Sequence, residues 1–225
     1  MAQTGPLAGR DAEVAALRAA LARGGGAYLA GRAGVGKSHL VEHVATWAAT
    51  QGYDVIRARA TAGSAELPLG VFLTQLGTSE RFLTPMFTEI RDRMLEHAAG
   101  RRILLCVDDI DRLDDASAVL IHQMVAAGEA QLLGTLRTGR MTPGEVLDLA
   151  QRGDLQRLEI EPMPRQAAEA MAEALLGTCL DRESHDRLWS VTHGNALFVR
   201  EVLLSAQELG QLVDGPNGTT LVELP

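Results

Sequence analysis

Short apolar runs alternate along the first 160 residues with longer stretches in which apolar residues recur every three or four positions. The short runs predict buried strands, and the periodic stretches predict helices with one buried face. The predicted strands cover residues 27–30, 53–58, 103–107, 130–136 and 155–160. The predicted helices cover residues 11–23, 37–50 and 116–127, with two more inside 69–99. This alternation predicts an α/β fold with a doubly wound parallel sheet.

Two local signals refine the helices. Phe82, Met86, Ile90 and Met94 recur every four residues, so one face of the second helix inside 69–99 is expected to face the core. Thr142-Pro-Gly-Glu145 has the spacing of a capping box. A short helix is therefore expected there, with Pro143 as its first helical residue.

The pattern changes after Glu161-Pro-Met-Pro164, where three helices are expected at residues 165–176, 181–192 and 196–209. They predict a small helical lid. Two short β-like runs then flank a Gly-Pro-Asn-Gly turn, and the chain stops without a terminal cap. We therefore expect an α/β domain over residues 1–161, a lid over 162–210, and the truncated start of a following region over 211–225.

Composition narrows the classes of protein. Hydrophobic residues make up 46% of the chain and aromatic residues only 4%, so the core must consist mainly of Leu, Val, Ala and Ile. A net charge of −8 argues against a free-standing nucleic-acid-binding protein. Residues 1–14 contain no apolar signal segment, and no apolar run could span a membrane, so we expect a cytoplasmic protein. Cys106 and Cys179 are expected to be reduced, packed thiols.

Lys37 is the only lysine among 21 basic residues, and it lies in Gly31-Arg-Ala-Gly-Val-Gly-Lys37-Ser38. This run matches the phosphate-binding pattern G-x-x-x-x-G-K-[ST] between a predicted strand and a predicted helix. Backbone N–H groups of the loop would face bound phosphates at the helix N-terminus. Lys37 would contact the β- and γ-phosphates, and Ser38 would bind Mg²⁺. The predicted nucleotide-binding residues here are Gly31, Gly34, Val35, Gly36, Lys37, Ser38 and His39.

A second signal is the apolar run 103–107, which ends in Asp108 and Asp109. The end of a buried parallel strand lies beside the phosphate loop, so Asp108 is expected to hold Mg²⁺ through its water shell. Asp109 is expected to orient and polarise the attacking water. A solvated acidic turn is the alternative, because Asp111, Asp114 and Asp115 crowd the same segment.

The next predicted strand ends in a polar pair, Thr135 and Arg137. This pair is expected to lie across the nucleotide from Asp108. Arg137 could contact the γ-phosphate or the attacking water and so register whether ATP or ADP is bound. The alternative is an arginine on the surface after a strand.

Two weaker segments, Gly9-Arg10 and residues 192–202, lie before and after the three motifs described above. Together they form an ordered set of five: Gly9-Arg10 and residues 31–38, 103–114, 132–137 and 192–202. The set resembles the ATPase module of the STAND class of signal-transduction NTPases, especially that of large LuxR-type transcriptional regulators of the MalT kind. The resemblance implies a P-loop NTPase that binds ATP or ADP with Mg²⁺, exchanges ADP for ATP on sensing an inducer, and then self-associates. DNA binding would belong to a C-terminal helix-turn-helix domain outside this chain.

The resemblance also implies roles for residues at both ends of the chain. Leu7 and Arg10 would help to hold the adenine end of the nucleotide, and Arg137 would be the sensor residue. Gly194-Asn-Ala196 would bring the lid to the nucleotide, although Ala196 replaces a proline of the family pattern.

Three functions remain open. The first is a nucleotide-dependent switch with slow ATP hydrolysis. The second is an AAA-type ATPase that loads or remodels DNA or protein complexes, which a ring with rapid turnover would favour. The third is a module that holds nucleotide without hydrolysis, against which Asp109 argues.

Overall fold

The computed structural model describes residues 7–72, 83–215 and 218–223. The chain forms two compact units. We call Glu13–Gly31 with Lys37–Glu159 the sheet unit, and Met1–Ala12, Arg32–Gly36 and Ile160–Pro225 the helical unit. The domain boundaries expected at residues 161 and 210 stay predictions.

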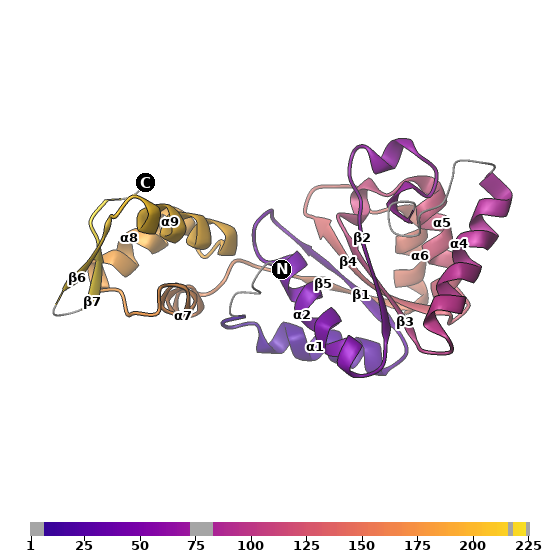
Figure 1. The fold of residues 1–225 in the computed structure, drawn as a ribbon, viewed down its shortest axis with the longest axis horizontal. Helices are drawn as coiled ribbons and strands as arrows, with labels where there is room; N and C mark the ends of the chain where they lie inside the picture. The colour runs from indigo at the N-terminus through magenta and orange to yellow at the C-terminus, as the bar shows by residue number, and fades with distance from the viewer. Residues whose placement is uncertain (1–6, 73–82, 216–217, 224–225) are drawn as a thin grey trace. The chain divides into compact units, whose positions relative to one another are not determined.

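A five-stranded parallel sheet forms the centre of the sheet unit (Figure 1). Its strands are β1 (Gly26–Gly31), β2 (Asp54–Arg59), β3 (Ile103–Asp108), β4 (Ala130–Arg137) and β5 (Leu155–Glu159). They lie in the order β2-β3-β4-β1-β5. Every residue of β1 is buried, as are all residues of β3 except Asp108. The predicted α/β fold with a parallel P-loop-type sheet is confirmed.

Helices cover both faces of this sheet. They are α1 (Asp11–Ala22), α2 (Lys37–Thr50), α4 (Leu83–Ala98), α5 (Asp115–Ala126) and α6 (Gly144–Arg152). Figure 1 shows α4, α5 and α6 on one face and α1 and α2 on the other. Ile90 and Met94 are fully buried in the core, as their spacing predicted.

Two of the helices expected from the sequence differ from the structure or lie partly outside the described residues. The helix expected from Thr142 begins one residue late, at Gly144, because Pro143 has an extended ψ of 142° and forms the N-cap without a side-chain hydrogen bond. Gly70 to Phe72 are helical, but most of the first helix expected inside 69–99, together with Phe82, lies outside the described residues.

Both cysteines are free thiols, and Cys106 is buried, which raises its pKa to about 12. Cys179 is exposed, so its expected packing was wrong.

The helical unit contains α7 (Arg165–Leu176), α8 (Arg182–Thr192) and α9 (Ala196–Glu208). An antiparallel pair follows, β6 (Leu212–Gly215) and β7 (Gly218–Leu221). Asp181 caps α8 by accepting the Ser184 N–H and also accepts the Thr220 hydroxyl, and these bonds lower its pKa to about 2. Within the described ranges, no helix combines the length and the apolarity that a membrane span requires.

Gly26 offers a test of the sheet packing. A Cβ atom there would lie 2.2 Å from the carbonyl oxygen of Leu132 and 2.9 Å from its nitrogen, and backbone atoms cannot turn aside as a side chain can. We expect Gly26→Ala to lower the free energy of unfolding by about 2 kcal/mol or more in urea titrations. Gly144→Ala, where a Cβ would meet nothing within 4 Å, is the control and should change it by less than about 1 kcal/mol. Equal stability of both variants would contradict the described packing of β1 on β4.

Candidate nucleotide-binding site

The predicted phosphate loop joins β1 to α2. Gly34 and Gly36 have φ angles of 79° and 101°, a region that side chains with a Cβ rarely adopt. Lys37 is the first residue of α2, is only 7% exposed, and donates from Nζ to the Gly31 carbonyl at 2.8 Å. Burial lowers the pKa of its ammonium group below the ordinary 10.5, although the nearby Asp109 carboxylate opposes the shift. An anion bound beside Lys37 would stabilise this charge.

Two carbonyl groups of the loop are held by the start of α9, within the helical unit. Asn195 donates from Nδ2 to the Ala33 carbonyl at 2.9 Å, and the Leu197 N–H donates to the Gly34 carbonyl at 3.0 Å. In a trans peptide plane the next N–H points opposite to the carbonyl. The N–H groups of Gly34 and Val35 therefore point away from α9, an orientation that leaves them available to phosphate oxygens.

Arg10 holds a third carbonyl of the loop. It is 5% exposed and donates from Nη2 to the Val35 carbonyl at 3.2 Å and to the Glu161 carbonyl at 2.6 Å. Arg10 is thus placed against backbone groups of its own unit, while Leu7 is half-buried. The contacts of both residues with adenine stay predictions.

Gly194 has a structural reason to be glycine. Its φ is 75°, and a Cβ would lie 2.1 Å from the Met163 carbonyl oxygen. The Met163 N–H in turn donates to the Gly194 carbonyl at 2.8 Å. This close backbone contact lies at the entry to α9, which begins at Ala196. Its contact with nucleotide likewise stays a prediction.

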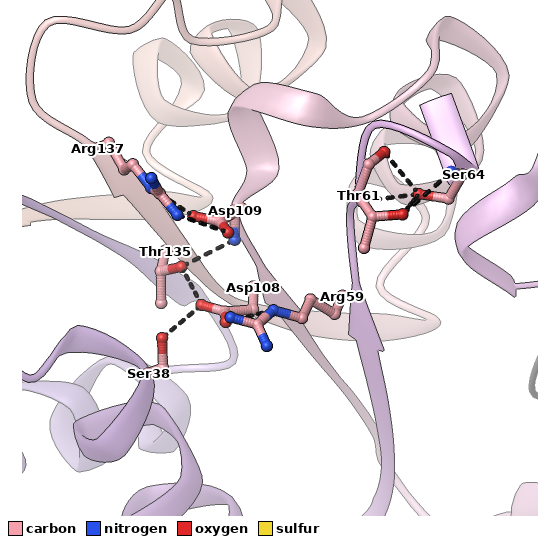
Figure 2. A network of polar contacts seen from close by, with 8 residues as sticks. All are labelled: Ser38, Arg59, Thr61, Ser64, Asp108, Asp109, Thr135 and Arg137. Atoms are coloured by element: carbon pink, nitrogen blue, oxygen red, sulfur yellow. Dashed lines mark hydrogen bonds and ion pairs between the residues drawn. The ribbon is translucent and has the colours of Figure 1, made fainter. Parts of the chain in front are cut away.

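Asp108 and Ser38, the two residues predicted to hold the metal, lie together in the sheet unit (Figure 2). Asp108 Oδ1 accepts the Ser38 hydroxyl at 2.6 Å and the Thr135 hydroxyl at 2.5 Å. Its other oxygen lies 3.4 Å from Arg59 Nε. Sequence analysis missed Arg59, although it ends β2 directly opposite Asp108 in the sheet register.

This pair of oxygen donors fits Mg²⁺, which prefers carboxylate, hydroxyl, phosphate and water ligands. Among the residues that the structure describes, no group of three or more His, Cys, Asp or Glu side chains could hold a metal ion. A cation at Ser38 and Asp108 would therefore take its remaining ligands from phosphate groups and water, as Mg²⁺ commonly does.

Asp109 and Arg137 form an ion pair that sequence analysis did not predict (Figure 2). Arg137 donates from Nε to Asp109 Oδ1 at 3.1 Å and from Nη2 to Oδ2 at 3.3 Å, and these bonds raise its pKa further. Asp109 is 8% exposed and has left-handed backbone angles, φ 56° and ψ 53°. Such a conformation costs about 1 kcal/mol outside glycine and often occurs at functional sites.

His39 lies on the first turn of α2. Its Nε2 atom is buried and has no hydrogen-bond partner among the described residues. Burial, with a smaller effect of His43, lowers the pKa of the ring, which favours the neutral form. The contact of His39 with nucleotide stays a prediction.

The Asp109–Arg137 pair can be tested by a double-mutant cycle on protein stability. Arg137→Ala, Asp109→Asn and the double variant should give a coupling energy of about 0.5–1 kcal/mol in urea unfolding, since the pair is partly exposed. The coupling should shrink in about 0.5 M salt because exposed charges are screened. A coupling energy indistinguishable from zero at low salt would show that the pair does not persist in solution.

Comparisons with known proteins place this geometry in a family. A model of the AAA ATPase domain matches residues 6–137. A search of curated proteins found no match.

Several solved structures share the fold. ORC1 from Aeropyrum pernix in complex with DNA is 19% identical with a TM-score of 0.63, covering 92% of this chain and 61% of that chain. DnaA from Aquifex aeolicus bound to AMPPCP is 18% identical with a TM-score of 0.64, covering 90% and 62%. A RuvB variant from Thermotoga maritima is 15% identical with a TM-score of 0.62, covering 91% and 66%.

At these identities the likeness shows a shared fold, and this chain spans under two thirds of the length of each of the three proteins. The family model, by contrast, matches more than half of the 225 residues. The chain therefore belongs to the family of AAA ATPase domains.

Proposed function

We propose that this ATPase domain is a slowly hydrolysing switch, whose ADP- or ATP-bound state controls self-association of a longer protein. In this proposal the loop from Gly31 to Ser38 binds the phosphates, and Lys37 contacts the β- and γ-phosphates. Ser38 and Asp108 hold Mg²⁺, which when bound neutralises charge on the phosphates. Asp109 orients the attacking water and accepts its proton.

The Asp109–Arg137 ion pair is the observation that carries this proposal. Arg137 donates to both carboxylate oxygens of Asp109, and these bonds make Asp109 a weaker proton acceptor for water until the pair opens. A γ-phosphate is a competing anion for Arg137, whereas ADP offers none at that position. Opening would thus depend on ATP, and the need to exchange partners would keep turnover slow.

The proposed assignment to a class of transcriptional regulators rests on the sequence motifs. Their order and spacing resemble the ATPase modules of STAND-class, MalT-like regulators, which supports a role in transcription regulation. In this proposal DNA binding belongs to a C-terminal domain outside this chain, and the net charge of −8 supports it because it disfavours DNA binding by these residues. We also propose the division into an ATPase domain over residues 1–161, a lid over 162–210 and the start of a further region over 211–225.

The second candidate is an ATPase that loads or remodels DNA or protein complexes. It is favoured by the fold shared with ORC1 bound to DNA, DnaA and RuvB. The two candidates differ in turnover and in assembly: a remodelling ATPase would form a ring with rapid hydrolysis, and a switch would hydrolyse slowly and change its association with the bound nucleotide.

The two acidic residues should behave differently when each is replaced by its amide. Asp108→Asn should weaken Mg·ATP binding and hydrolysis together, because Asp108 acts on the metal. Asp109→Asn should spare binding and lower kcat by roughly 10²-fold, because Asp109 acts on water. Titration with a fluorescent ATP analogue and steady-state phosphate release measure the two effects.

Lys37→Ala is the reference for lost binding in these titrations. It removes a buried charged donor and should weaken nucleotide binding by at least ~2–3 kcal/mol. Unchanged affinity in folded Lys37→Ala would remove Lys37 from the site. Identical behaviour of the two amide variants would refute the separate metal and water roles.

Assembly and DNA binding separate the two candidate functions. We expect the chain to self-associate with Mg·ATP but not with ADP in sedimentation velocity experiments. In mobility-shift assays at ~150 mM salt it should show no sequence-specific DNA binding, because phosphates would meet mostly carboxylates. The last long helix carries little free positive charge: Arg200 pairs with Glu201 at 2.9 Å. A specific shift, or a ring with rapid turnover, would favour the remodelling ATPase.

A further inference from the structure

We propose that Thr135 is a positioning residue for the ATPase reaction, and that its single hydroxyl group sets the relative placement of Asp108 and Asp109. The inference rests on the proposed function, since it assigns metal binding to Asp108 and water activation to Asp109. It adds a residue that belongs to neither role and acts through both acidic residues.

Thr135 is a buried residue near the carboxyl end of β4. It is 1% exposed and pairs with Leu29 of β1 on one side. On the other side the pairing of β3 with β4 ends at Val107 opposite Gly134, one residue before Thr135. Beyond that point the side chain of Thr135, instead of a strand ladder, connects β4 to the end of β3.

The hydroxyl group uses both its donor and its acceptor capacity. It donates to Asp108 Oδ1 at 2.5 Å and accepts the backbone N–H of Asp109 at 2.9 Å (Figure 2). One oxygen atom thus bridges the side chain of the first acidic residue and the backbone of the second. No apolar side chain of the same size could make either bond.

Each bond fixes a different group. The donated bond, together with that from Ser38, holds Asp108 Oδ1 at the place where the metal ligands meet. The accepted bond satisfies the backbone N–H of Asp109. Asp109 is the residue at which the chain turns, with a left-handed φ of 56°. That turn directs the Asp109 carboxylate to Arg137.

The packing around β4 brings these groups together. A Cβ atom at Gly134 would lie 3.0 Å from Ile110 Cγ2, so glycine allows the fully buried Ile110 to lie against the strand. Ile110 follows Asp109 directly and therefore anchors the turn above Thr135. Gly134 thus allows the turn after β3 to lie close to β4, and the Thr135 hydroxyl forms the hydrogen bonds between the two segments.

Three substitutions separate the hydroxyl group from the rest of the side chain. Thr135→Val keeps the shape and removes the hydroxyl, Thr135→Ala removes the hydroxyl without any risk of overpacking, and Thr135→Ser keeps the hydroxyl. Circular dichroism and urea unfolding establish that each variant is folded. The readouts are binding of a fluorescent ATP analogue as a function of Mg²⁺ concentration, binding without Mg²⁺, and kcat.

We expect Val and Ala to raise the Mg²⁺ concentration for half-maximal nucleotide binding by about 10-fold or more and to lower kcat by a similar factor, as residues that orient metal ligands do. Binding without Mg²⁺ should stay unchanged, and Thr135→Ser should restore most of both properties. A purely structural role would change stability alone.

The outcomes distinguish this inference from the proposed function. If the unchanged chain binds no nucleotide, the proposed function fails and the role of Thr135 fails with it. If the unchanged chain binds Mg·ATP without hydrolysing it, only the hydrolysis is refuted, and the Mg²⁺ titration still decides on Thr135. If folded Val and Ala variants keep the Mg²⁺ dependence, or if Ser behaves as Val does, the role of the Thr135 hydroxyl is refuted.

Discussion

Parallel pairing of the central strands is the constraint on which the rest of the site depends. Because all five strands run in the same direction, their carboxyl ends meet at one edge of the sheet. The register places Gly31 of β1 opposite Arg137 of β4, and Arg59 of β2 opposite Asp108 of β3. Residues separated by up to 106 positions thereby gather at one edge of the sheet, where Asp108 contacts Arg59 and Asp109 contacts Arg137.

This edge of the sheet carries a balance of positive and negative charges that a bound phosphate would change. Asp108 lies beside Arg59, and Asp109 is paired with Arg137. Lys37, whose pKa is lowered by burial, lies among the same groups. In such a cluster an incoming polyanion competes with the carboxylates for the cations, so binding would rearrange partners as well as add contacts. Binding of a polyanion at the site would therefore release the Asp109 carboxylate from Arg137.

Much of this arrangement could be predicted from the sequence, because it depends on local patterns. The helix after the phosphate loop was predicted with its observed bounds, Lys37–Thr50, and the apolar strand ending in Asp108 placed that residue beside Ser38. Other features depend on contacts between distant segments. A sequence gives no rotamer for Arg137, so its bond to Asp109 could not be foreseen. The positions of Arg10 on the Val35 carbonyl and of Gly194 against Met163 likewise depend on how remote backbones approach.

The left-handed backbone at Asp109 limits which amino acids can replace it. Asn and Gly adopt that conformation readily, whereas β-branched residues are strongly disfavoured there. A library of all substitutions at position 109 should therefore divide in two. Asn and Gly would test the loss of the carboxylate alone, while Val, Ile and Thr would also displace the turn that leads to Ile110. The shape of the main chain thus decides which variants report on chemistry and which report on folding.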